Sequence, residues 1–117
     1  MVDKKKALNL LGLAYRARKV INGEENVIEN LQKGKCKIVI VANDASMRTL
    51  DKFQKKCFFY NTQLITDFTC EELSKALGKG LVKIIALTDQ GFCNAFCENL
   101  KWGVAYESKR YIRSFKW

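Results

Sequence analysis

The chain has 117 residues, about the size of one domain, and 48% of them are hydrophobic, which is enough for a single buried core. Its 21 lysines and arginines outnumber its 12 aspartates and glutamates and leave a formal charge of +9, so nucleic acid is the first partner to consider, although many soluble basic proteins share this balance. The chain has no histidine, which removes the commonest metal ligand and the usual agent of acid-base catalysis, and no apolar run of about 18 residues that could cross a membrane.

The first part of the chain predicts two helices. Apolar residues recur at helical spacing over residues 7–15, which indicates an amphipathic first helix. A short extended stretch near Val20 follows, and the Asn22-Gly23 pair predicts a turn. Glutamates directly after this turn favour the start of a second helix, because negative side chains are stabilised there by the helix dipole. We expect this helix to end at Gly34.

The middle of the chain predicts a strand, a helix and a second strand. KIVIVA, residues 37–42, is a continuous β-branched run, typical of a central strand covered on both faces. Either Asp44 or Ser46 can cap the third helix that follows. TQLIT, residues 62–66, then indicates a short strand.

The last predicted elements continue this alternation. Thr69 and Glu72 have the spacing of a capping box and open a fourth helix that we expect to end at Gly78. VKIIAL, residues 82–87, predicts another buried strand, and Asp89 can cap a fifth helix with a strong apolar stripe. The whole pattern favours an α/β fold: a three-layer α/β/α sandwich in a single domain, residues 1–100, around a small mixed, mostly parallel sheet.

Residues 101–117 break the alternation and form a basic aromatic C-terminal extension. Basic residues interleaved with tryptophan, tyrosine and phenylalanine suit single-stranded RNA, through phosphate neutralisation and base stacking. An apolar tail packed on the domain and a disordered end are the alternatives.

The chain offers no recognisable catalytic, metal or cofactor site. Its five cysteines are scattered without a Cys-x-x-Cys pair, which favours reduced core thiols, and the pair one helical turn apart falls short of the four ligands of a structural zinc. A nucleotide-binding P-loop is excluded, since Gly78-Lys79 has Leu73 at the position of its first glycine and Gly80 at that of its hydroxyl. We therefore expect a cytoplasmic protein that is not an enzyme and needs no cofactor.

Two segments resemble the signature regions of a known family. They are NLLGLAYRARKVINGEENVIENLQKGKCKIVIVANDAS and EELSKALGKGLVKIIALTDQGF. Both resemble the bacterial YlxQ branch of the superfamily of small ribosomal proteins that bind kink-turn RNA, and the resemblance covers residues 7–100. It implies the same sandwich, with RNA held by the start of the second helix and by the loop before the last strand.

The resemblance also implies site residues. The superfamily pattern Gly-x-Asn-Glu-x-x-Lys falls on residues 23–29, where Gly23 matches, Glu25-Asn26 inverts the Asn-Glu pair and Glu29 replaces the lysine. Lysines further along this helix would compensate, and apolar loop residues would shelter an extruded nucleotide. The implied RNA-binding residues are Gly23, Glu24, Glu25, Asn26, Glu29, Lys33, Lys35, Lys37, Lys79, Gly80, Leu81 and Val82.

Two functions remain open from the sequence. The first is non-enzymatic binding of kink-turn or other structured RNA, by a monomer associated with the ribosome or the translation apparatus. The second is a protein-interaction module of the same fold that has lost kink-turn binding, because three glutamates and no basic residue occupy residues 23–30. Neither function involves a membrane or a metal.

Overall fold

Helices and strands alternate throughout residues 4–100, the part of the chain that the computed structural model describes. The predicted extension, residues 101–117, lies outside it. The helices are α1 (Lys4–Arg16), α2 (Glu24–Gln32), α3 (Met47–Phe59), α4 (Cys70–Leu77) and α5 (Gln90–Asn99). The strands are β1 (Val20–Asn22), β2 (Ile38–Val41), β3 (Gln63–Ile65) and β4 (Ile84–Leu87).

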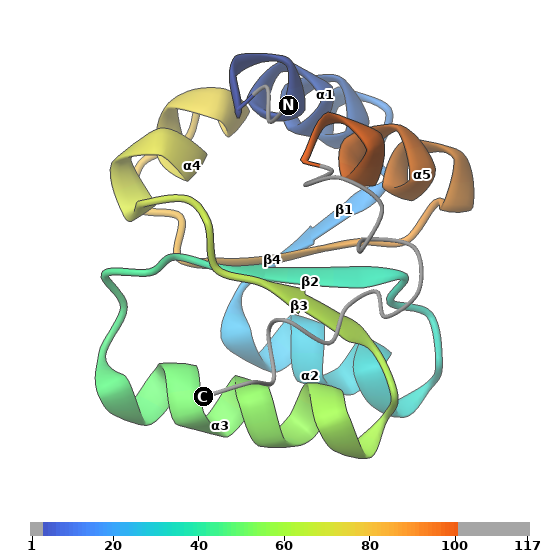
Figure 1. Cartoon of the computed structure of the whole chain (residues 1–117), viewed down its shortest axis with the longest axis vertical. Coiled ribbons are helices and arrows are strands. Elements are labelled where there is room, and N and C mark those ends of the chain that lie inside the picture. The colour runs from blue at the N-terminus through green and yellow to red at the C-terminus, as the bar shows by residue number, and fades with distance from the viewer. Residues whose placement is uncertain (1–3, 101–117) are drawn as a thin grey trace.

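The elements form three layers, as the sequence predicts. Helices α1, α4 and α5 cover one face of the sheet, and α2 and α3 cover the other (Figure 1). Every residue of β2 and β4 is buried, which confirms that the β-branched runs are central strands covered on both sides. Among the described residues no helix is long and apolar enough to span a bilayer.

A hydrophobic cluster fills the space on each side of the sheet. On the side of α1, α4 and α5, the rings of Phe68 and Phe96 lie 6.0 Å apart and are fully buried beside Leu11. On the side of α2 and α3, Phe53 and Val27 are fully buried. Burying side chains of this size contributes about 1.5–3 kcal/mol each, so the two clusters fix both helical layers on the sheet.

The prediction of a mostly parallel sheet is wrong. The strand order is β1-β4-β2-β3, and β4 runs antiparallel to both of its neighbours, so only β2 and β3 pair in parallel. Helices α2 and α3 each carry the chain back to the end of the sheet where the preceding strand began. The segment through α4 instead returns to the end where β3 stopped, because Ile84 at the start of β4 pairs with Val41 at the end of β2.

The structure confirms the predicted caps of α4 and α5 and decides between the two candidates for the cap of α3. Ser46 rather than Asp44 caps α3, and its side chain accepts a hydrogen bond from the Thr49 N–H. Thr69 forms the predicted capping box at the start of α4, and Asp89 caps α5. Asp44 instead accepts a hydrogen bond of 2.9 Å from the Cys70 N–H, which ties the segment after β2 to the start of α4.

Helices α1 and α4 pack in close contact through a glycine. A Cβ atom placed on Gly12 would lie 2.7 Å from the carbonyl oxygen of Ala76, closer than such atoms approach in proteins. Gly12 is itself buried within α1. The absence of a side chain at this position therefore sets the spacing between the two helices.

Candidate nucleic-acid interface

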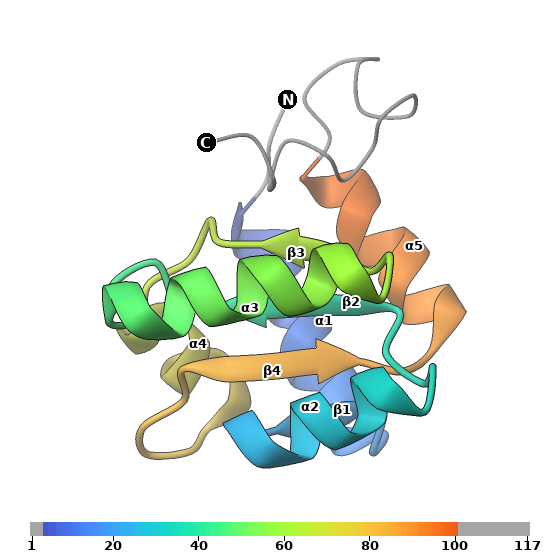
Figure 2. The same ribbon diagram turned by 90° about the horizontal axis from the view of Figure 1, so that it is seen from below.

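The two elements named by the resemblance lie side by side at one end of the sheet. The Gly23 N–H donates a hydrogen bond of 3.0 Å to the carbonyl of Ile84, so the start of α2 adjoins the start of β4. The loop of residues 78–83 leads directly into β4, and Figure 2 shows this loop beside the first turn of α2. The candidate interface is thus built from a helix N-terminus and a neighbouring loop.

The start of α2 is suited to an anionic or polar ligand. Gly23 has a φ of 104°, a conformation that favours glycine, and no side chain caps the helix at this position. Uncapped N–H groups at a helix N-terminus and the positive end of its dipole favour phosphate. Asn26 is exposed and donates from its side chain to the carbonyl of Asn22 at 3.1 Å, which orients its amide at the surface.

Ion pairs compensate two of the three glutamates of α2. Glu24 lies 2.6 Å from the ammonium of Lys52 on α3, and Glu29 lies 3.1 Å from that of Lys33. Glu25 forms no ion pair with any residue in the described part of the chain. The acidity of this helix end is therefore smaller than its sequence indicates.

Lys52 is a member of this site that the sequence gives no reason to choose. It lines an open depression together with Glu24, Glu25 and Asn26. Lys52 is 28 residues away from Glu24 in the chain and belongs to another helix. Only the packing of α3 beside α2 brings the two together, so no local pattern marks it.

The loop of residues 78–83 presents one apolar side chain and anchors the next. Leu81 is 74% exposed, whereas Val82 is fully buried. The Val82 N–H donates a hydrogen bond of 2.9 Å to the hydroxyl of Ser74 on α4. The hydroxyl of Ser74 therefore holds the end of the loop against α4.

The glycines of the loop leave it open. Gly78 ends α4 in the left-handed conformation, with φ 70° and ψ 29°. A Cβ atom on Gly78 or on Gly80 would meet nothing within 4 Å. Lys79 between them extends its ammonium to 5.6 Å from the centre of the Tyr15 ring on α1, a cation–π distance.

The other implied lysines lie away from this end of the sheet. Lys33 and Lys35 follow the C-terminus of α2, about 14 Å from its start by the rise of a nine-residue helix. The Lys37 N–H donates to the carbonyl of Leu87, at the end of β4 opposite to Ile84. The implied residues thus form two groups, and Val82 lies beneath the surface, where it is fully buried and its N–H is bonded to Ser74.

Three of the buried core cysteines have raised pKa values. Burial raises the pKa of Cys36 to about 11, and burial together with the nearby Cys36 raises the pKa of Cys57 to about 12. A hydrogen bond with Cys97, and then burial, raise the pKa of Cys93. These thiols stay protonated near neutral pH, and within the described residues no three Cys, His, Asp or Glu side chains gather in a way that could hold a metal.

These features define a small α/β/α sandwich protein whose candidate site lies on a helix N-terminus and a glycine-bounded loop at one end of the sheet. The chain belongs to the Ribosomal protein L7Ae/L30e/S12e/Gadd45 family, whose sequence model matches residues 5–97.

Two relatives in this family are close in sequence. The chain is 40% identical over 85 residues to the RNA-binding protein YlxQ of Bacillus subtilis (strain 168), covering 73% of this chain and 85% of that protein. It is 41% identical over 90 residues to the RNA-binding protein YlxQ of Enterococcus faecium, covering 77% and 86%.

Two solved structures have the same fold. A protein of unknown function from Bacillus halodurans C superposes with a TM-score of 0.77 at 35% identity, over 80% of this chain and 95% of that one. The Giardia lamblia 15.5kD RNA binding protein superposes with a TM-score of 0.72 over 82% of both chains. At 16% identity, the second likeness concerns the fold alone.

Proposed function

We propose that this protein binds structured RNA that contains a kink turn, as a cytoplasmic, non-enzymatic monomer associated with the ribosome or the translation apparatus. The observation that carries the proposal is the hydrogen bond between Gly23, at the uncapped start of α2, and Ile84, the first residue of β4 after the glycine-bounded loop. The names of the YlxQ relatives and the formal charge of +9 support RNA as the ligand.

The start of α2 and the loop have complementary tasks in this proposal. The side chains of Glu25 and Asn26 face solvent and can exchange hydrogen bonds with the exposed edges of sheared G·A pairs, while nearby backbone N–H groups favour phosphate. Leu81 projects its apolar side chain from the adjoining loop and shelters a nucleotide that leaves the stack at the kink. A stem without a kink presents neither feature to this surface.

The ion pairs of α2 make this assignment compatible with its acidic sequence. Lys52 and Lys33 offset Glu24 and Glu29, so the bound RNA faces Glu25 as the one glutamate of α2 without an ion pair among the described residues. A carboxylate accepts hydrogen bonds from amino groups, which the edge of guanine provides. In this proposal Glu25 therefore recognises base edges and does not contribute to the electrostatic attraction of the RNA.

Binding titrations with matched RNAs test the proposal. We expect the full chain to bind a kink-turn RNA more tightly than the same RNA with its sheared pairs changed to Watson-Crick pairs. Leu81→Ser should reduce this preference, whereas Leu13→Ser, a change at another exposed leucine on α1, should not. Equal affinity for the two RNAs would refute the proposal.

A second candidate function, a protein-interaction module, is favoured by one feature of α3. Met47, Phe58 and Phe59 are 82%, 70% and 77% exposed on this helix. Large exposed apolar side chains are typical of protein interfaces. Under this hypothesis, Phe59→Ser would abolish capture of a protein partner, and the chain would bind neither of the two RNAs at moderate salt.

A further inference from the structure

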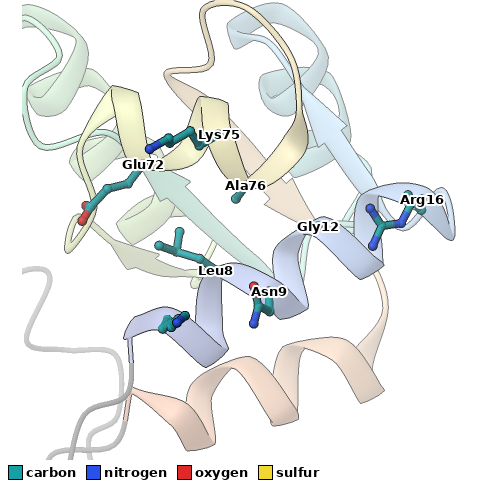
Figure 3. A pocket seen from close by; sticks show the side chains of 8 residues that line it. Leu8, Asn9, Gly12, Arg16, Glu72, Lys75 and Ala76 are labelled. Carbon is teal, nitrogen blue, oxygen red and sulfur yellow. The ribbon is translucent and has the colours of Figure 1, made fainter.

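A hollow between α1 and α4 lies outside the candidate interface but adjoins it. It has a volume of about 500 Å³ and is open to solvent. Figure 3 shows Asn9 and Arg16 on the α1 side of it and Lys75 on the α4 side, with Gly12 and Ala76 where the two helices approach each other. We call this hollow the α1–α4 groove; its lining residues are Lys5, Leu8, Asn9, Gly12, Arg16, Glu72, Lys75 and Ala76.

The lining of the groove is strongly basic. Lys5, Arg16 and Lys75 are exposed and form no ion pair with any described residue. Glu72 is the one acidic residue among the described residues of the lining, and its Oε1 atom already accepts a hydrogen bond from the Thr69 N–H and lies 3.5 Å from the ammonium of Lys4. The groove therefore carries uncompensated positive charge.

The groove continues from the loop of the candidate interface. Lys79 of that loop extends over Tyr15, and Tyr15 immediately precedes Arg16 at one end of the groove. Lys75 lies one turn before Gly78, where the same loop begins. A ligand that occupies the loop thus meets the basic residues of the groove if it extends in this direction.

We propose that the α1–α4 groove binds the sugar-phosphate backbone of an RNA stem that leaves the kink, an inference that rests on the proposed function. Lys5 and Arg16 are eleven residues apart on α1, which corresponds to roughly 17 Å by the helix rise and is enough for several consecutive phosphates. None of the described residues that line the groove is aromatic, so its lining favours phosphate and ribose over stacked bases. Leu8 and Ala76 form an apolar floor against which ribose packs.

The test compares two triple variants of the full chain that remove the same charges. The groove variant carries Lys5→Gln, Arg16→Gln and Lys75→Gln. The control variant carries Arg48→Gln, Lys55→Gln and Lys56→Gln, one arginine and two lysines of α3 on the opposite face of the sheet. Thermal unfolding verifies that both variants fold. Each is titrated with a kink-turn RNA trimmed to its core and with RNAs in which one or the other stem is longer by a helical turn.

Each phosphate contact contributes about 0.7–0.9 to the slope of log affinity against log salt concentration, so three contacts contribute about 2. For one of the lengthened RNAs we expect the groove variant to lose this slope and, near 0.1 M salt, about a hundredfold in affinity. Its affinity for the trimmed RNA should change only slightly, and the control variant should bind every RNA like the unmodified chain.

The outcomes separate this inference from the proposed function. If the groove variant binds both lengthened RNAs like the unmodified chain, the assignment of the groove to RNA backbone is overturned. An acidic protein segment then becomes the better occupant of the groove, and the proposed preference for kinked RNA is unaffected. If the unmodified chain does not distinguish kinked from unkinked RNA but the groove variant still loses affinity for the lengthened stem, the proposed function fails and the groove stands as a backbone-binding surface.

Discussion

Replacing Gly12 by alanine tests how the spacing of α1 and α4 is set. The new Cβ atom would lie 2.7 Å from the Ala76 carbonyl oxygen, a backbone atom that cannot rotate out of the way. Overpacking of this kind costs about 1–3 kcal/mol. The better helix propensity of alanine returns about 1 kcal/mol. We therefore expect Gly12→Ala to lower the free energy of unfolding by up to about 2 kcal/mol, and Gly12→Val to lower it further.

Thermal and urea unfolding followed by circular dichroism measure this change. For a domain of this size, a loss of 1 kcal/mol corresponds to a decrease in Tm of about 4–8 °C. Gly80→Ala is the matched control, because a Cβ atom there meets nothing within 4 Å and its φ lies outside the left-handed region. This control should leave stability unchanged or raise it by up to about 1 kcal/mol. If Gly12→Ala instead raises stability by about 1 kcal/mol, as helix propensity alone predicts, the two helices are not held at this distance by the glycine.

Three further predictions concern a cap, a loop anchor and a thiol. Thr69→Ala removes the hydroxyl of the capping box and should lower the free energy of unfolding by about 1 kcal/mol in urea denaturation; an unchanged free energy of unfolding would contradict this. Ser74→Ala leaves the Val82 N–H without its acceptor and should both destabilise the fold by about 1 kcal/mol and weaken binding of kinked RNA; unchanged affinity would show that the loop needs no anchor. Because burial raises the pKa of Cys57 to about 12 in the folded protein from an ordinary 9.0, its contribution to stability is complete below pH 9 and declines as the pH rises toward 12. Cys57→Ala should therefore show a shallower loss of stability in alkaline urea titrations, and parallel pH profiles would contradict this assignment.

The sequence was sufficient to predict the helices and the caps of α4 and α5, and it left the cap of α3 open between Asp44 and Ser46. Capping depends on residues three positions apart, so the relation of Thr69 to Glu72 and the place of Asp89 could be seen without any tertiary information. Burial on both faces of β2 was equally visible, because a strand covered on both sides has apolar residues at every position.

The direction of the strands could not be predicted in this way. Alternation of helices and strands is compatible with a segment that crosses the sheet and with one that returns to the same end. The segment through α4 returns, which makes β4 antiparallel to β1 and β2. The same geometry brings the loop before β4 beside the start of α2. The antiparallel direction of β4, which the sequence pattern did not predict, therefore assembles the candidate site.

Residue roles at the site also depend on tertiary packing. Leu81 and Val82 are adjacent apolar residues in the sequence, yet Leu81 is exposed and Val82 is buried. The Val82 N–H donates a hydrogen bond to the Ser74 hydroxyl, which holds Val82 against α4. Lys52 reaches Glu24 only because α3 packs next to α2. A pattern within one segment contains neither relation.

The charge distribution predicts that affinity and specificity reside in different parts of this surface. Near the start of α2, Glu24 and Lys52 neutralise each other and Glu25 remains, so contacts there add little attraction for a polyanion but discriminate between base edges. The α1–α4 groove has the opposite character, since its free basic residues attract phosphate without reading sequence.

Glu25→Gln should therefore reduce the preference for kinked over unkinked RNA and leave the salt dependence unchanged. The groove variant should reduce the salt dependence for the lengthened stem and leave the preference unchanged. Titrations of both RNAs at several salt concentrations measure the two quantities together, and a single variant that alters both to the same extent would contradict this separation.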